Sequence, residues 1–176
     1  NLLGIKNLKN KIDLKTYPSL ESQIVAISDD IAYNNHDLQD GLRANLFTMD
    51  KINSVPFLSK FINKHIRNQR KYRKEIIINQ FIRDIINSMV VDVINTTHKN
   101  LKKTKPKSLN DIYKNNSLIV DFSSEMKEID TQIKDFLKYN MYNNKKVIIN
   151  TNKGKKIIKK LFNHLIKNPK KHINGD

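Results

Sequence analysis

Acidic and aromatic side chains recur at helical spacing in residues 19–42, SLESQIVAISDDIAYNNHDLQDGL. On a helix that turns about 100° per residue, five polar residues share a wedge of about 100°: Asp29, Tyr33, His36, Asp37 and Asp40. Carboxylate oxygens are the ligands that hard divalent cations take. Residues 19–42 contain no Lys or Arg, and the next basic residue is Arg43, although the chain carries a formal charge of +16. The pattern therefore predicts a cation or substrate site on this face.

The same wedge is also what a solvated helix face looks like, and the sequence leaves that interpretation open. Surface helices usually mix charge signs to gain i, i+4 pairs, whereas this face carries acids alone. One helix face is not sufficient for a catalytic metal site, which needs three or four converging groups. The other histidines have no metal-binding spacing, and each is expected on the surface: His65, His98, His164 and His172.

The opposite pole of this segment is apolar, as expected for a helix that packs on a core. Its stripe consists of Leu20, Ile24, Ile27, Ile31 and Leu38. Ser19 is a good N-cap and Glu21 suits the positive end of the helix dipole. The sequence predicts a helix from Ser19 to about Leu38 that ends or bends near Gly41, preceded by an irregular stretch over residues 1–17.

The apolar residues of the remaining chain also recur at helical spacing. The whole chain has only 4 Gly and 4 Pro, the residues that usually mark turns, so we expect one all-α domain. Helices are predicted over residues 56–66, 73–95 and 151–167, the last ended by Asn168-Pro169. A further helix is predicted to begin at a Ser123 or Ser124 cap. Residues 101–108 are expected to form a basic loop, and residues 117–122 a short extended piece. The core stripe of the 73–95 helix is predicted as either Ile77, Phe81, Ile85 and Met89, or Ile82, Ile86, Val90 and Val93. A second stripe is predicted at Met126, Ile129, Ile133, Phe136 and Leu137.

Composition narrows the function classes. The absence of cysteine excludes zinc-thiolate sites, thiol nucleophiles and disulfides, and suits a reducing cytoplasm. No apolar run approaches the roughly 20 residues of a membrane span, so we expect a cytoplasmic protein without a membrane partner. Thirty-three Lys and Arg against 17 Asp and Glu attract phosphates of nucleotides or nucleic acid. An AT-rich genome would also enrich lysine, and both explanations remain open.

Residues 19–44 resemble a region of bacterial deoxyguanosine triphosphate triphosphohydrolases. The resemblance begins with SLESQ at 19–23 and continues through DDIAYNNHDLQDGLRA at 29–44. Shorter matches follow at SMVVDVI (88–94), VDFS (120–123), FL (136–137) and MY (141–142). In that family the first region provides the last metal-binding aspartate of an HD domain. The resemblance covers most of the chain, and its first motif is the longest and most specific.

The resemblance implies a helical HD-domain phosphohydrolase, with residues 1–50 ending the HD domain and residues 51–176 forming its C-terminal helical part. It implies hydrolysis of a deoxynucleoside triphosphate to deoxynucleoside and tripolyphosphate, with Mg or Mn held by a His, a His-Asp pair and a distant Asp. Asp29 matches that distant metal ligand. Tyr33 would lie against the sugar and Asp37 would hydrogen-bond the sugar hydroxyl. Asp30 would lie near the phosphates and act through water, the metal or a structural partner.

The resemblance also identifies what this chain lacks. By this resemblance the family's HD pair lies upstream of the matched segment, so His36-Asp37 is not that pair; its two side chains would also point about 100° apart on the helix. No histidine precedes Pro18, so we expect a fragment without the upstream His and His-Asp ligands, inactive alone and with no catalytic residue beyond the metal ligand. After Met-Tyr, where the family carries basic or histidine residues, this chain has Asn143-Asn144-Lys145-Lys146. The two lysines could substitute there as point charges.

Two other functions are compatible with the sequence. A non-catalytic helical module could bind nucleic acid through the lysines of residues 153–160, with Tyr142 and Phe162 as the nearest aromatic rings for base stacking. The chain could also be the oligomerisation half of a larger enzyme, and we expect a homo-oligomer. Strongly salt-dependent binding would distinguish the nucleic-acid module from the hydrolase.

Overall fold

The computed structural model of the protein describes residues 16–66 and 72–167, and the N-terminal stretch expected to be irregular lies largely outside them. Its elements are α2 (Leu20–Arg43), α3 (Met49–Asn53), α4 (Pro56–Ile66), α5 (Lys74–Thr104), α6 (Leu109–Tyr113), α7 (Ser124–Leu137), a π-helical segment η1 (Lys138–Tyr142) and α8 (Lys145–Lys167). These two ranges contain no β-strand. The predicted all-α fold class is confirmed.

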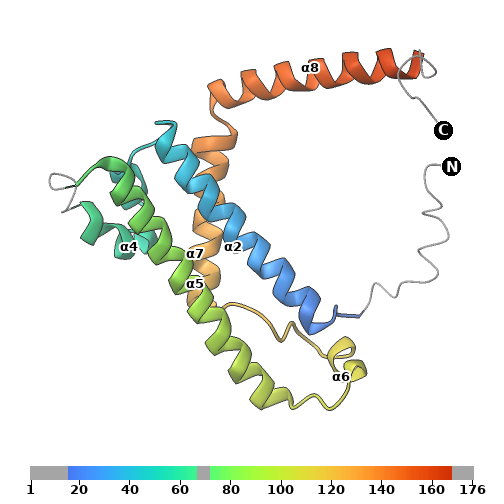
Figure 1. Cartoon of the computed structure of the whole chain (residues 1–176). Helices are drawn as coiled ribbons and strands as arrows, with labels where there is room; N and C mark the ends of the chain where they lie inside the picture. The colour runs from blue at the N-terminus through green and yellow to red at the C-terminus, as the bar shows by residue number, and fades with distance from the viewer. Residues whose placement is uncertain (1–15, 67–71, 168–176) are drawn as a thin grey trace.

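The long helices α2 and α5 lie side by side and run in opposite directions, with α7 packed on α2 and α4 packed on α5 and α7 (Figure 1). The core lies between these four helices. The α7 stripe is buried, and of the two stripes predicted for α5, Ile77, Phe81, Ile85 and Met89 are all buried whereas Val90 of the alternative is exposed. Helices α5 and α7 each pack on α2 and α4, so both apolar faces enter one core. From α2, Ile31, Leu38 and Leu42 are buried in the same core, but Ile24 near its start is half exposed.

Helix α2 continues through Gly41 to Arg43, so the predicted end near Leu38 was five residues early. Gly41 has a packing role instead. A Cβ atom at this position would lie 2.3 Å from the ring of Phe47. Phe47 is buried there and meets Phe136 of α7 edge to face, with 4.8 Å between ring centroids. The glycine therefore lets a ring pack between the end of α2 and α7.

Helix α5 extends to Thr104, so the first four residues of the predicted basic loop are helical. Lys105 ends the helix with a left-handed φ of 46°. Asn100, beyond the predicted end, donates a 2.9 Å hydrogen bond to the Ile119 carbonyl and ties the last turns to a distant segment. A long-range contact of this kind leaves no local sequence pattern, which explains the missed turns.

The short helix α6 was also missed. It begins with a capping box, in which Ser108 and Asp111 satisfy each other's backbone N–H groups. Hydrogen bonds from the backbone of Lys107, then from Ser108, lower the pKa of the Asp111 carboxyl. Helix α8 begins at Lys145, six residues before the predicted start. Asn168-Pro169, the predicted stop, lies outside the described residues.

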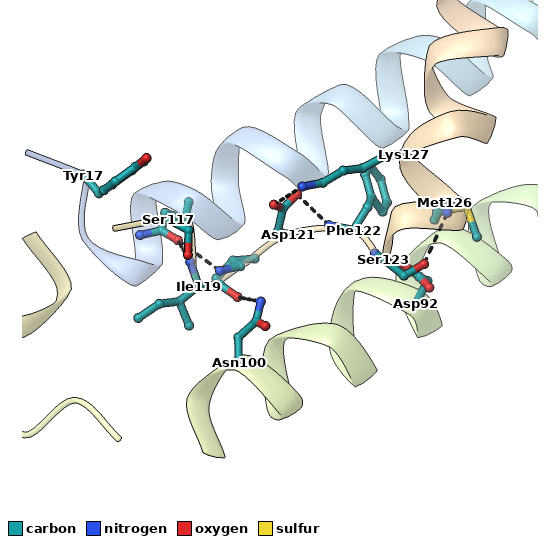
Figure 2. A network of polar contacts seen from close by, with 12 residues as sticks. Tyr17, Asp92, Asn100, Ser117, Ile119, Asp121, Phe122, Ser123, Met126 and Lys127 are labelled. Atoms are coloured by element: carbon teal, nitrogen blue, oxygen red, sulfur yellow. Dashed lines mark hydrogen bonds and ion pairs between the residues drawn. The ribbon is translucent and has the colours of Figure 1, made fainter. Parts of the chain in front are cut away.

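The predicted extended piece at residues 117–122 is an irregular segment without strand pairing. Its backbone is held by side chains instead. Gln23 of α2 accepts hydrogen bonds from the N–H groups of Ile119 (2.9 Å) and Val120 (3.0 Å) and donates one to the Pro18 carbonyl (2.8 Å). Further along, the carboxylate of Asp92 accepts a 2.8 Å bond from the backbone of Ser123, the N-cap of α7 (Figure 2).

We expect Gln23→Ala to destabilise the fold by about 2 kcal/mol, because it leaves two buried backbone N–H groups without an acceptor. Urea denaturation followed by circular dichroism measures this loss. Ser28→Ala, at an exposed position of the same helix, should change the free energy of unfolding by less than about 0.5 kcal/mol. Equal effects of the two substitutions would show that the Gln23 hydrogen bonds do not stabilise the segment.

Candidate functional site

The acidic face of α2 is built from successive helical turns. Ser19 caps the helix, as predicted, by accepting a hydrogen bond from the Ser22 backbone. Asp29 and Tyr33 are exposed, and Asp37 is partly buried where α2 meets η1. Four residues advance a helix by about 6 Å, so Asp29 and Asp37 stand about 12 Å apart along its axis with Tyr33 between them. That spacing suits an elongated ligand along the helix.

Asp37 is fixed by a tyrosine from the other end of the chain. The hydroxyl of Tyr142 in η1 donates a hydrogen bond to Oδ2 of Asp37. Partial burial raises the pKa of Tyr142, and the bond to Asp37 and the nearby Tyr33 raise it further. The hydroxyl therefore remains a donor throughout the neutral range. It engages one carboxylate oxygen of Asp37 and leaves the other for a second donor.

Asp30 is paired with a lysine of α7. The ammonium group of Lys134 lies 2.9 Å from Oδ2 of Asp30 and 2.8 Å from Oδ2 of Asp130. The other oxygen of Asp130 accepts a 3.2 Å hydrogen bond from the buried Asn34 of α2. Burial by itself would lower the pKa of Lys134, but the bonds to Asp130 and Asp30 outweigh it and raise the pKa. Asp30 thus has a structural partner, whose single positive charge it shares with Asp130.

Asp29 differs from both neighbours. Within residues 16–66 and 72–167, neither Asp29 nor Asp40 makes a side-chain hydrogen bond or ion pair. An exposed, unpaired carboxylate is a suitable oxygen donor for Mg or Mn. The same ranges contain no group of three or more His, Asp or Glu side chains that could hold a metal ion. The described residues therefore offer one candidate ligand for such a site, and the acidic face of α2 is a candidate wall of it.

Two contacts of this wall were absent from the sequence prediction. Lys134 carries a local signal, since it follows Asp130 at i+4, where opposite charges pair on a helix. Its bond to Asp30 spans 104 residues and has no such signal. Tyr142 is placed by a π-helical turn, a rare geometry that is frequent at functional sites and that helical-wheel reasoning does not anticipate.

The prediction that all isolated histidines lie on the surface was wrong for His65. Its ring is buried in α4, 3.0 Å from a carboxylate oxygen of Asp84, with the Phe81 ring centroid 6.0 Å away. Asp84 on α5 gives the imidazole a polar partner, which offsets the free-energy cost of burying a polar ring. His36, His98 and His164 are exposed, and His172 lies outside the described residues.

Comparison with known proteins identifies the class. Residues 120–176, which include α7, η1 and α8, match the phosphohydrolase-associated domain. A deoxyguanosinetriphosphate triphosphohydrolase-like protein of Pelagibacter ubique is 48% identical over 175 residues, 99% of this chain and 47% of the relative. Proteins of the same name from Bartonella tribocorum and Agrobacterium fabrum are 38% and 37% identical over 93% and 90% of this chain, and 41% and 39% of their own lengths.

The C-terminal third of the chain thus matches a phosphohydrolase-associated domain. More particularly, the chain is similar along nearly its whole length to the C-terminal portion of the deoxyguanosinetriphosphate triphosphohydrolase-like family, and the resemblance inferred from its motifs is confirmed. The chain spans about half the length of these relatives. None of the helices in the described ranges combines the length and apolar character needed to cross a membrane.

Proposed function

We propose that this chain is part of a divalent-metal-dependent deoxynucleoside triphosphate triphosphohydrolase, which releases deoxynucleoside and tripolyphosphate. The observation that carries the proposal is that three carboxylates of α2 have different partners. Asp30 is paired with Lys134 and Asp37 is oriented by Tyr142, whereas Asp29 is exposed and, within the described residues, unpaired. Asp29 is the residue that the family resemblance assigns to the metal.

The residues of this chain would bind and orient the nucleotide. Tyr33 offers an exposed ring for the deoxyribose, and Asp37 offers a carboxylate oxygen to a sugar hydroxyl. Tyr142 would keep Asp37 in place while the substrate exchanges. Lys145 and Lys146, just beyond η1, carry charges suited to the phosphates. When bound, the metal would polarise the phosphate and lower the pKa of water.

The missing ligands follow from the same proposal. A His and a His-Asp pair from another part of the enzyme would complete the metal site with Asp29. The test uses the longest polypeptide that contains this chain together with those ligands, incubated with each of the four deoxynucleoside triphosphates and Mg or Mn. We expect free deoxynucleoside from at least one of them, and none after chelation of the metal. Failure with every nucleotide would contradict the proposal.

Tyr142→Phe should weaken substrate binding without unfolding the protein. The substitution keeps the ring but removes a hydrogen bond to a charged group, which corresponds to about a tenfold rise in KM. We expect kcat to change much less, since Tyr142 acts through Asp37 and not on the phosphate. Steady-state kinetics on the full enzyme separate these effects. A fall in kcat as large as the rise in KM, together with a lower melting temperature, would indicate a purely structural role.

A non-catalytic module for nucleic acid is the second candidate. Its supporting feature is α8, which has eight lysines and no acidic residue. The helix offers Phe162 as its one phenyl ring, and stacking on aromatic rings is a main source of affinity for single strands. This function predicts tight binding that falls steeply with salt and is unchanged in Asp29→Ala. The triphosphohydrolase proposal predicts that Asp29→Ala lowers nucleotide turnover by a factor on the order of 1,000.

A further inference from the structure

Three polar side chains along one edge of α2 bond to the segment formed by α7 and η1. They are Asp30, Asn34 and Asp37, and their spacing of i, i+4 and i+7 places them within about 60° of one another on the helix. Each has a partner on α7 or η1: Lys134 for Asp30, Asp130 for Asn34 and Tyr142 for Asp37. Asp29 and Tyr33 each precede one of these bonded residues by one position, so the bonded edge borders the proposed site.

The rotation of α2 about its own axis decides where Asp29 points. Side chains on a helix end about 5–6 Å from the axis, so a rotation of about 10° moves such an end by about 1 Å. A misplacement of about 1 Å at a catalytic site can lower the rate on the order of 100-fold. A metal ligand on α2 therefore needs contacts that hold this rotation closely.

Apolar packing is sparse around Asp29. From Leu20 to Asp30, the buried residue of α2 is Gln23, and Ile31 is the first apolar side chain of the helix to be buried in the core. Apolar side chains tolerate repacking, whereas a hydrogen bond depends on direction as well as distance. The polar bonds to α7 are thus the contacts best suited to fix the rotation of this part of α2.

The bonds closest to Asp29 form one connected group. Asn34 and Asp130 are 6% and 9% exposed, and 3.2 Å separates the Asn34 amide nitrogen from Oδ1 of Asp130. The ammonium group of Lys134 lies 2.8 Å from Oδ2 of Asp130 and 2.9 Å from Oδ2 of Asp30. Lys134 and Asp130 are one turn apart on α7, where opposite charges pair. The carboxylate of Asp130 therefore holds the ammonium group at the position from which it reaches Asp30.

We propose that Lys134 and Asp130 are positioning residues that set the rotation of α2 and so aim Asp29 at the metal. Lys134 keeps Asp30 turned toward α7, and Asp130 holds Asn34. Both act through α2 and not on the metal or the nucleotide. Of the roles open to Asp30, this inference selects the structural one. It rests on the proposed triphosphohydrolase function and assigns the alignment of the metal ligand to α7.

The test is Lys134→Met in the complete enzyme, which keeps an apolar side chain and removes the ammonium group. We expect kcat to fall by a factor of about 10–100, because the metal end of α2 loses its alignment. KM should change little, since Tyr142 still holds Asp37 at the sugar end. Titration with Mn followed by electron paramagnetic resonance should show weaker metal binding. Lys134→Arg can bond both carboxylates and should restore kcat to within about threefold of the unmodified enzyme.

Lys127→Met is the matched control. Lys127 lies seven residues earlier on α7, is similarly exposed, and pairs with Asp121 instead of with α2. The substitution removes one ion pair of the same kind, so kcat and Mn affinity should stay within about twofold of the unmodified enzyme. Equal losses of kcat in Lys127→Met and Lys134→Met would overturn the positioning role, because they would trace the effect to the charge of α7 in general.

A second variant separates positioning from folding. Lys134→Met leaves the buried Asp130 charged without its ammonium partner, which lowers stability. Combining it with Asp130→Asn removes that charge, and the introduced amide can still accept the bond from Asn34. We expect this double variant to keep the melting temperature of the unmodified enzyme and to show the same loss of kcat as Lys134→Met.

The outcomes for the two proposals differ. A folded double variant with normal kcat and normal Mn affinity would overturn the positioning role and leave the triphosphohydrolase proposal standing. An unmodified enzyme that turns over no nucleotide would overturn both. In the Asp29→Ala background, Lys134→Met should lower kcat little further, because it acts through Asp29. A full additional loss there would also overturn the positioning role.

Discussion

Asp29→Ala is expected to lower kcat/KM for the deoxynucleoside triphosphate on the order of 1,000-fold in the complete enzyme. Removing a metal ligand forfeits several kcal/mol of transition-state stabilisation, and each 1.36 kcal/mol is a factor of ten. The side chain is exposed and makes no bond within residues 16–66 and 72–167. Its loss should therefore leave the fold intact. Steady-state kinetics, together with Mn titration followed by electron paramagnetic resonance, measure both consequences.

Asp40→Ala is the matched control for this experiment. Asp40 lies on the same face of α2 and is likewise exposed, and it has no partner in the described part of the chain. It lies three turns beyond Asp29, past Tyr33 and Asp37. We expect activity within about twofold of the unmodified enzyme, in line with a surface substitution away from the site. Comparable losses in the two variants would indicate that only the overall charge of the face is needed.

Phe47→Ala is expected to destabilise the fold by about 3–5 kcal/mol. The ring is 4% exposed, packs against Gly41 at the end of α2, and meets Phe136 of α7 at 85°. Its removal leaves a cavity between the two helices that carry Asp37 and Lys134. Because the backbone around a glycine and a second ring cannot fully close this space, the cavity adds to the loss of apolar burial. Urea denaturation gives the change in the free energy of unfolding.

Tyr139→Ala provides the comparison, since the Tyr139 ring is 67% exposed near the same end of α7. We expect a change below about 0.5 kcal/mol. If Phe47→Ala were as mild, the packing of Phe47 between α2 and α7 would not be a significant source of stability. A large loss for Phe47→Ala with a small one for Tyr139→Ala would assign the energy to this contact.

Elements with local signals were predictable from the sequence. Ser19 and Ser123 cap α2 and α7 as their residue types suggested, and α4 has the predicted bounds. The apolar stripe of α7 is buried throughout because its helical period matches one continuous core. The same wheel placed Asp29, Tyr33 and Asp37 on one face, and α2 is helical across all three.

Features that depend on distant contacts were not predictable. Tyr142 reaches Asp37 across 105 residues, and Lys134 reaches Asp30 across 104. The extra turns of α5 and the irregular backbone of residues 117–122 likewise rely on Asn100 and Gln23, which satisfy backbone groups far away in sequence. His65 can be buried because Asp84 on the neighbouring helix α5 provides a polar partner for its ring. The assigned roles of Asp29, Asp30, Tyr33 and Asp37 remain predictions.

The identity of the products tests the central claim most directly. Phosphorus-31 magnetic resonance of the reaction of the complete enzyme with dGTP and Mn distinguishes tripolyphosphate from pyrophosphate and monophosphate. Attack at the α-phosphorus predicts one tripolyphosphate for each deoxyguanosine released, and no signal change in Asp29→Ala. Release of monophosphate or pyrophosphate, or unchanged turnover in Asp29→Ala, would contradict the account.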